Sequence, residues 1–338
     1  MTHGPLMLDL EGYELTDDER ELAVHPMVGG IILFSRNYRD PAQLEYLTRS
    51  IRELRPDILI SVDHEGGRVQ RFRNGFTRIP PMASLGALFM KDPEAALELA
   101  WDIGWLMASE LLAYGLDFTF APVLDLDYGT SDVIGDRAFS GRPDVVTRLA
   151  DALIEGLHEA GMPAIGKHFP GHGFVAADSH VDLPVDERSF SEIDASCLKP
   201  FTALCPMLDG VMPAHVIYKQ VAPEPAGFSP YWLKDILRRQ LGFKGVIFSD
   251  DLGMAGAAIA GDYGARTHAA LSAGCDMVLV CNDRAGALQV LDALEDYEFS
   301  PRSEQRLAAL SVHSRPTLDA LDADPRYNRV ADLLESLV

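Results

Sequence analysis

Eight short apolar runs, separated by segments with helical patterning, limit most strongly what this chain can fold into. The runs span residues 7–10, 29–34, 58–63, 118–126, 163–169, 210–215, 245–251 and 277–281. Each run is continuous rather than alternating, which is typical of strands covered on both faces. Helical crossovers between such strands produce a parallel sheet, and eight of them favour a closed barrel. An open, doubly wound sheet is the alternative.

Helix-start signals lie between the runs. Four capping residues stand directly before a proline, at Asp40, Asp92, Ser229 and Ser300. Two capping boxes pair Thr16 with Glu19 and Ser189 with Glu192. The chain has no Ser/Gly-rich linker, so we expect one α/β domain over residues 1–338, a single (β/α)8 barrel. A C-terminal helical extension is expected at about residues 315–338.

Composition argues against several classes of function. The chain has 29 Lys and Arg against 51 Asp and Glu, for a net charge of −22. With no basic stripe to neutralise phosphates, neither nucleic acid nor an anionic membrane is an expected partner. No continuous apolar stretch approaches the ~18 residues that a membrane-spanning helix needs. The N-terminal sequence does not resemble an export signal. We therefore expect a cytoplasmic monomer whose four cysteines are buried thiols.

Polar residues follow the apolar runs, where the active site of a parallel barrel lies. Asp63 ends the third run and Glu65 follows it, the latter expected to pair with Arg68 or Arg71. Asp250 follows four apolar or small residues. Its carboxylate should point into the barrel mouth, where it could attack a sugar carbon or hold a cation. The alternative is that one of Asp250 and its neighbour Asp251 only caps the next turn.

The segment KHFPGHGFVAADSHVDLP, residues 167–184, concentrates groups that transfer protons. Its glycines predict a loop, and Asp178 precedes His180 by two residues. In a turn, such a carboxylate can hydrogen-bond to the imidazole, fixing its tautomer and raising its pKa. A solvated polar loop is the alternative explanation.

Four groups of motifs occur in a family-specific order. They are DHEGGRVQRF at 63–72, IGDRAFS at 134–140, KHFPGHG at 167–173 with DSH at 178–180, and FSDDLGM at 248–254. This series resembles glycoside hydrolase family 3, in particular its short β-N-acetylglucosaminidases of the NagZ type. The likeness runs from about residue 7 to about residue 285.

The resemblance implies roles for individual residues. Asp250 would be the nucleophile that forms a glycosyl-enzyme intermediate, and Asp178 with His180 the dyad that protonates the leaving group. The implied reaction removes a terminal β-linked N-acetylglucosamine from anhydro-N-acetylmuramyl fragments during cytoplasmic cell-wall recycling, without a metal or cofactor. The residues implied to bind the hydroxyls of the terminal sugar are Asp63, Arg71, Arg137, Lys167 and His168.

Other functions stay open at this point. A metal-dependent hydrolase would draw on histidines and carboxylates, although no His-x-His motif ends an early strand. The adjacent Asp186 and Glu187 could orient a substrate acetamido group that acts as nucleophile, although they stand beside a capping box. A non-catalytic sugar-binding protein and a phosphorolytic enzyme are further alternatives. The candidate metal ligands are His168, His172, Asp178, His180 and Asp250.

Overall fold

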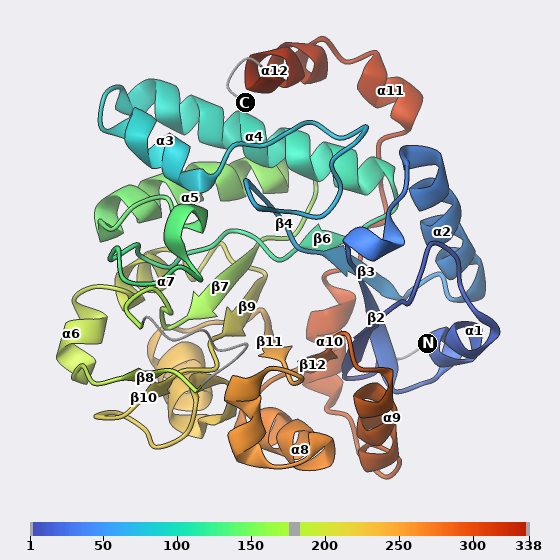
Figure 1. Ribbon diagram of the computed structural model, residues 1–338, viewed down its shortest axis with the longest axis vertical. Helices are drawn as coiled ribbons and strands as arrows, with labels where there is room; N and C mark the ends of the chain where they lie inside the picture. The colour runs from blue at the N-terminus through green and yellow to red at the C-terminus, as the bar shows by residue number, and fades with distance from the viewer. Residues whose placement is uncertain (1–2, 176–182, 336–338) are drawn as a thin grey trace.

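Eight parallel strands form the centre of the computed structural model, which describes residues 3–175 and 183–335 (Figure 1). The sheet order places β12 beside β1, and bridges from Thr119 to Ala164 and from Val123 to Lys167 join its two ends. The predicted closed barrel is therefore confirmed, and the open sheet is wrong. In barrel order the strands are β1 (Leu6–Asp9), β2 (Val28–Leu33), β3 (Leu59–Val62), β6 (Phe118–Thr119), β7 (Ile165–Phe169), β9 (Gly210–Pro213), β11 (Val246–Asp251) and β12 (Met277–Val280).

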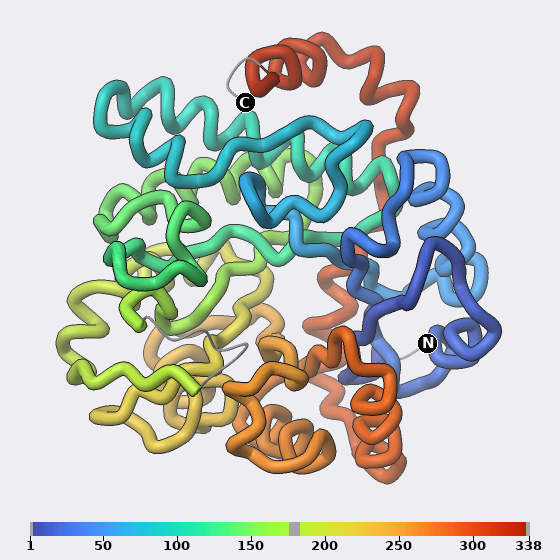
Figure 2. Tube along the Cα trace, in the orientation of Figure 1, coloured from blue at the N-terminus to red at the C-terminus, as the bar shows by residue number. Residues whose placement is uncertain are grey.

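Helices surround the barrel, connecting each strand to the next and continuing after the last strand, β12 (Figure 2). Between β1 and β7 these are α1 (Asp17–Val24), α2 (Pro41–Leu54), α3 (Met82–Phe89), α4 (Pro93–Ala113) and α5 (Pro143–Glu159). After β7 they are α6 (Phe190–Asp194), α7 (Leu198–Leu204), the π-helix η4 (Tyr231–Gln240), α8 (Tyr263–Ala273), α9 (Arg284–Ala293), α10 (Pro301–Ala308), α11 (Leu318–Asp322) and α12 (Pro325–Glu335).

Shorter elements occupy several of the connections. The strands β4 (His64–Gly66) and β5 (Val69–Gln70) form a hairpin after β3, and β8 (Val185–Asp186) pairs in parallel with β10 (Ile217–Tyr218). These pairs give order to connections at the mouth of the barrel. The 3-10 turns are η1 (Ser35–Asn37), η2 (Gly135–Arg137), η3 (Ala226–Phe228) and η5 (Ala255–Ala260).

Most of the predicted helix starts agree with the structure. Asp40 and Asp92 each accept a hydrogen bond from a backbone N–H at the start of α2 and α4, and both predicted capping boxes form. Ser300 stands directly before α10, but its side chain makes no capping hydrogen bond. The helix that contains η4 (Tyr231–Gln240) likewise follows Ser229, because Pro230 is helical and the carbonyl of Ser229 accepts the N–H of Leu233 at 3.0 Å. The hydroxyl of Ser229 makes no capping hydrogen bond to a described residue.

Aromatic packing fills the inside of the barrel below the end of β11. The rings of Phe120 and Phe248 lie 5.2 Å apart, and that of Phe118 is 5.6 Å from Phe248. Because β6 and β11 are not neighbours in the sheet, these rings meet across the barrel interior. The register of β11 against β12 shifts between Phe248 and Asp251. Beyond this point, at the mouth of the barrel, Asp250 lines a cavity.

The C-terminal helices pack against the outside of the barrel. In Figures 1 and 2, α12 lies across α4. The hydroxyl of Tyr327 donates to Glu110 at 2.8 Å, and Val330 and Leu334 are buried. A single domain over residues 1–338 stays a prediction. All four cysteines are buried and free. Within residues 3–175 and 183–335, no helix combines the length and apolar character needed to cross a membrane.

Candidate active site

A cavity of about 280 Å³ opens at the carboxyl ends of the barrel strands. The structure brings together at this cavity each predicted site residue that it describes. Asp178 and His180 lie outside the described residues, so their predicted roles are not tested by the structure. The predicted residues that line the cavity are Asp63, Arg71, Arg137, Lys167, His168 and Asp250.

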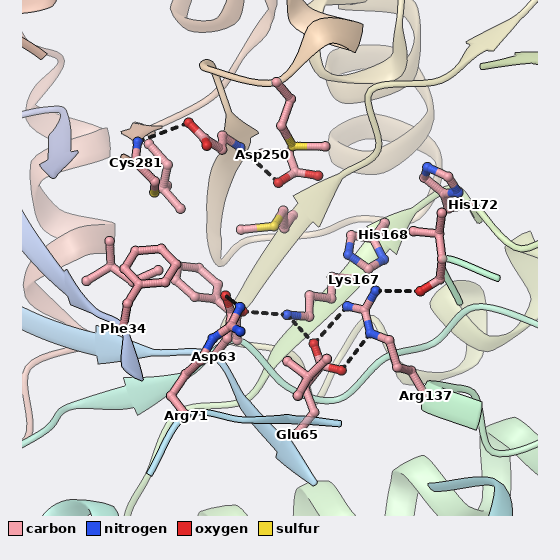
Figure 3. Close-up of a pocket in the computed structure, with 18 of the residues that line it drawn as sticks. Phe34, Asp63, Glu65, Arg71, Arg137, Lys167, His168, His172, Asp250 and Cys281 are labelled. Carbon is pink, nitrogen blue, oxygen red and sulfur yellow. Dashed lines mark hydrogen bonds and ion pairs between the residues drawn. The ribbon is translucent and has the colours of Figure 1, made fainter. Parts of the chain in front are cut away.

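Cations and carboxylates alternate along one wall of the cavity (Figure 3). Lys167 Nζ, on β7, lies 2.8 Å from Asp63 Oδ1 and 2.6 Å from Glu65 Oε1. The guanidinium of Arg137 binds Glu65 through two parallel hydrogen bonds of 2.8 Å each. Arg71 donates to Asp63 at 3.4 Å. The wall is therefore a continuous network of three cations and two carboxylates.

Both carboxylates of this wall are held in their charged form. Burial alone raises the pKa of Asp63, but the charges of Lys167 and Arg71 outweigh it, so the pKa lies below its ordinary value. Burial likewise raises the pKa of Glu65, and Arg137 with Lys167 brings it below its ordinary value. Ionised carboxylates accept hydrogen bonds, and the cations donate them. Such a wall suits the hydroxyl groups of a sugar, which do both.

Glu65 is a cavity residue whose partners the sequence analysis predicted wrongly. It pairs with Arg137 and Lys167, whereas Arg68 forms an ion pair with Asp136 at 3.1 Å. The reason is that the barrel closes on itself, which places η2 and β7 beside the end of β3. The signal that could have identified Glu65 is its position two residues after Asp63 at the same strand end.

His168 is fixed by a buried carboxylate. Its Nδ1 lies 2.7 Å from Asp125 Oδ2, and the other oxygen of Asp125 accepts the backbone N–H of His172 at 2.6 Å. Burial raises the pKa of Asp125, but His168 more than offsets this effect, so the pKa lies below its ordinary value. The charged carboxylate therefore holds the imidazole of His168 in the cavity wall.

Asp250 stands across the cavity from the Lys167 network (Figure 3). Its neighbour Asp251 has a structural task, because its Oδ1 accepts the backbone N–H of Gly253 at 2.8 Å and that of Cys281 at 3.0 Å. Burial raises the pKa of Asp251 to about 7. Of the two adjacent acids, Asp251 is thus the one that fixes the turn, and Asp250 presents a carboxylate to the cavity.

The two acids that the acetamido-nucleophile alternative requires do not lie at the cavity. Asp186 forms an ion pair with Arg188, Glu187 forms one with Lys219, and neither acid lines the cavity. This pair cannot orient an acetamido group there. For the metal alternative, no cluster of three or more His, Cys, Asp or Glu side chains among residues 3–175 and 183–335 is arranged to hold a metal ion. Two of its candidate ligands, Asp178 and His180, lie outside those residues, so the structure does not test it in full.

Comparison with known proteins identifies the family. The model of the glycosyl hydrolase family 3 N terminal domain matches residues 7–309. The chain belongs to glycosyl hydrolase family 3. A family relative from Thiobacillus denitrificans, named beta-hexosaminidase, is 57% identical over 331 residues, covering 97% of this chain and 92% of its own. The resemblance predicted from the motifs is confirmed.

Solved structures agree with this assignment. Native NagZ from Neisseria gonorrhoeae is 43% identical, with a TM-score of 0.93, and the match covers 100% of this chain and 98% of that chain. The structure of NagZ from the same organism in complex with N-trifluoroacetyl-D-glucosamine is 44% identical, with a TM-score of 0.94 and the same coverage. This family 3 chain therefore has the fold of NagZ along its whole length.

Proposed function

We propose that this family 3 glycoside hydrolase is a retaining exo-β-N-acetylglucosaminidase. The observation that carries the proposal is the position of Asp250 at the end of β11, across a sugar-sized cavity from the Lys167 network. The relatives named beta-hexosaminidase and the glucosamine derivative bound by NagZ from Neisseria gonorrhoeae support the choice of sugar.

The proposed reaction has two steps. Asp250 attacks the anomeric carbon and forms a covalent glycosyl ester, which water then hydrolyses. His180, paired with Asp178, donates a proton to the leaving oxygen in the first step and accepts one from water in the second. The residues proposed to bind the sugar hydroxyls are Asp63, Arg71, Arg137, Lys167 and His168.

The proposed substrates are peptidoglycan fragments that carry N-acetylglucosamine on anhydro-N-acetylmuramyl peptides. The enzyme would act on them in the cytoplasm, as a monomer without a cofactor, and recycle cell-wall material. Hydrolysis is proposed rather than phosphorolysis. Added phosphate should therefore neither raise the rate nor yield a sugar phosphate.

The first test is release of nitrophenol from the β-N-acetylglucosaminide and the β-glucoside, with a chelator present throughout. We expect the wild type to cleave only the acetamido sugar, and Asp250→Ala to lose at least about a thousandfold in kcat. Asp251→Asn is the matched control, and it should retain most of the activity because its side chain serves the turn. No cleavage by the wild type would favour a sugar-binding protein. Activity lost to the chelator would favour a metal-dependent hydrolase.

The proposed dyad also predicts a pH dependence. The rate should fall on both sides of near-neutral pH, because Asp250 must be ionised while His180 exchanges one proton in each step. The measurement is kcat/KM for the nitrophenyl glycoside against pH. A profile that stays flat from acid to alkaline pH would contradict the dyad.

A further inference from the structure

Arg188 connects three segments near the barrel mouth. Its side chain is only 9% exposed and forms a two-pronged ion pair with Asp186 on β8. It also donates to the hydroxyl of Tyr128, in the segment after β6, at 3.1 Å, and to the sulfur of Cys197, directly before α7, at 3.0 Å. All of these contacts lie between described residues outside the sugar cavity.

The same guanidinium also packs on an aromatic ring. Its central carbon lies 3.9 Å from the ring centre of Phe174, and the ring of Tyr128 meets that of Phe174 edge-on at 5.3 Å. Phe174 is 39% exposed, which is unusual for so large an apolar side chain. Its position is explained by the cation that it covers.

Phe174 belongs to one end of the segment that follows β7, and this end is tightly held. The backbone at Gly173 packs so closely on Leu126 that a Cβ atom there would lie 1.9 Å from the carbonyl oxygen of Leu126. The hydroxyl of Tyr218 donates to the backbone carbonyl of Gly171 at 2.9 Å. The hydroxyl of Thr130 donates to the backbone carbonyl of Phe174 at 3.2 Å.

The other end of the segment is held by strand pairing. Val185 and Asp186 pair with Ile217 and Tyr218, so β8 is fixed to the connection that follows β9. Arg188 contacts both ends, since it binds Asp186 on one side and stacks on Phe174 on the other. One side chain therefore ties the two ends of the segment to each other.

The residues between those ends include Asp178 and His180. A proton donor must come within about 3 Å of the leaving oxygen, so the positions of the ends limit where it can act. We infer that Arg188 is a positioning residue for the proton transfer assigned to Asp178 and His180, an inference that rests on the proposed function. Arginine suits this task because its planar fork binds a carboxylate and stacks on a ring at once, which lysine cannot do.

A positioning role for Arg188 predicts a selective effect on one step of the reaction. Arg188 does not line the cavity, whereas Asp250, on β11, does. A change at Arg188 should therefore impair protonation of the leaving group and spare nucleophilic attack. A good leaving group needs no proton, whereas an alkoxide leaving group needs one.

The test compares kcat/KM for dinitrophenyl and methyl β-N-acetylglucosaminides. Arg188→Lys should lose about tenfold or more on the methyl glycoside and less than about threefold on the dinitrophenyl glycoside. Phe174→Leu, which removes the ring at a partly exposed site, should show a smaller loss in the same direction. His180→Ala provides the reference, with the largest difference between the two substrates.

Arg326→Lys is the matched control. Arg326 also stacks on a ring, 3.8 Å from the centre of Trp101, and pairs with Asp102, but it lies on α12, away from the mouth. Its replacement should leave the ratio of the two rates unchanged.

The outcomes separate the possible failures. If Arg188→Lys and Phe174→Leu change both rates by the same factor, or change neither, the positioning role is overturned. If His180→Ala leaves the ratio unchanged, the acid/base assignment fails. If the wild type cleaves neither glycoside, the proposed function fails.

Discussion

At the scale of single residues, Glu65 controls the charge balance of the cavity wall. Its carboxylate neutralises Lys167 and Arg137, and the side chains of Glu65 and Lys167 are each 3% exposed. Removing the negative charge of Glu65 would leave buried cations without a partner. The free-energy cost of such an unpaired buried charge exceeds the stabilisation that the intact ion pair provides. A neutral residue at this position should therefore affect both stability and substrate binding.

We predict that Glu65→Gln lowers the free energy of unfolding by about 3 kcal/mol and raises KM for the nitrophenyl glycoside. Denaturant unfolding and steady-state kinetics would measure the two effects. Asp144→Asn is the control, because Asp144 forms an exposed ion pair with Arg142 at 2.7 Å, and it should cost less than about 1 kcal/mol. Equal unfolding midpoints for the two variants would show that the wall does not depend on the charge of Glu65.

The sequence predicts individual positions well where local geometry determines them. Asp250 could be placed at the barrel mouth because it ends an apolar run. The partners of Glu65 could not be predicted, because Arg137 lies 72 residues further along the chain and reaches Glu65 only through the fold. The roles of Asp178 and His180 remain predictions.

At the scale of secondary structure elements, β11 connects the packed interior to the reacting group. Phe248 is fully buried between Phe118 and Phe120, and Asp250 follows it by two residues on the same strand. A cavity at Phe248 would therefore loosen the strand that holds the proposed nucleophile.

We predict that Phe248→Ala lowers the free energy of unfolding by about 3–5 kcal/mol and reduces kcat. Thermal or denaturant unfolding alongside kinetics would measure this. Leu288→Ala on α9 is the comparison, because Leu288 is 47% exposed and its truncation should change stability by no more than about 0.5 kcal/mol. Full activity in a clearly destabilised Phe248→Ala would argue against a link between this packing and the position of Asp250.

The elements that could not be predicted from the sequence are mostly strands too short to show a regular alternation of apolar and polar residues. Each of the eight apolar runs became a barrel strand, because continuous burial leaves a clear hydrophobic signal. The pairs β4–β5 and β8–β10 consist of strands of two or three residues, in which no alternation can be detected. The π-helical winding of η4 likewise leaves no distinct pattern of apolar residues.

At the scale of the whole molecule, buried histidines make the fold sensitive to acid. Burial lowers the pKa of His64 to about 3, and it also lowers the pKa of His172 and His215. Below about pH 6.5 the unfolded chain takes up protons at these residues more readily than the folded chain does. Their contribution to stability is therefore complete above that pH and is lost progressively as the pH falls.

We predict that stability falls between about pH 7.5 and pH 5, by about 2 kcal/mol from His64 alone. Denaturant unfolding at several pH values would measure the slope. His64→Phe should flatten it, since the ring of His64 lies among Phe72 and Phe76 and an aromatic replacement fits there. His313→Phe, at an exposed position, should leave the slope unchanged. An unaltered slope in His64→Phe would exclude this residue as the source.

The seam between β6 and β7 has a consequence for the order in which the parts of the site are made. Lys167 forms the seam with its backbone, accepting from Leu124 N at 2.7 Å and donating to Pro122 O at 3.1 Å, while its side chain completes the charged wall. Asp63, Glu65 and Arg137 all leave the ribosome earlier. A nascent chain that ends before β7 therefore lacks the lysine of the charged wall, whereas the ring itself closes only when the last strand, β12, pairs with β1. Asp250, on the later strand β11, lines the same cavity, so a sugar held between the wall and Asp250 would contact both the first-made and the later-made half of the chain.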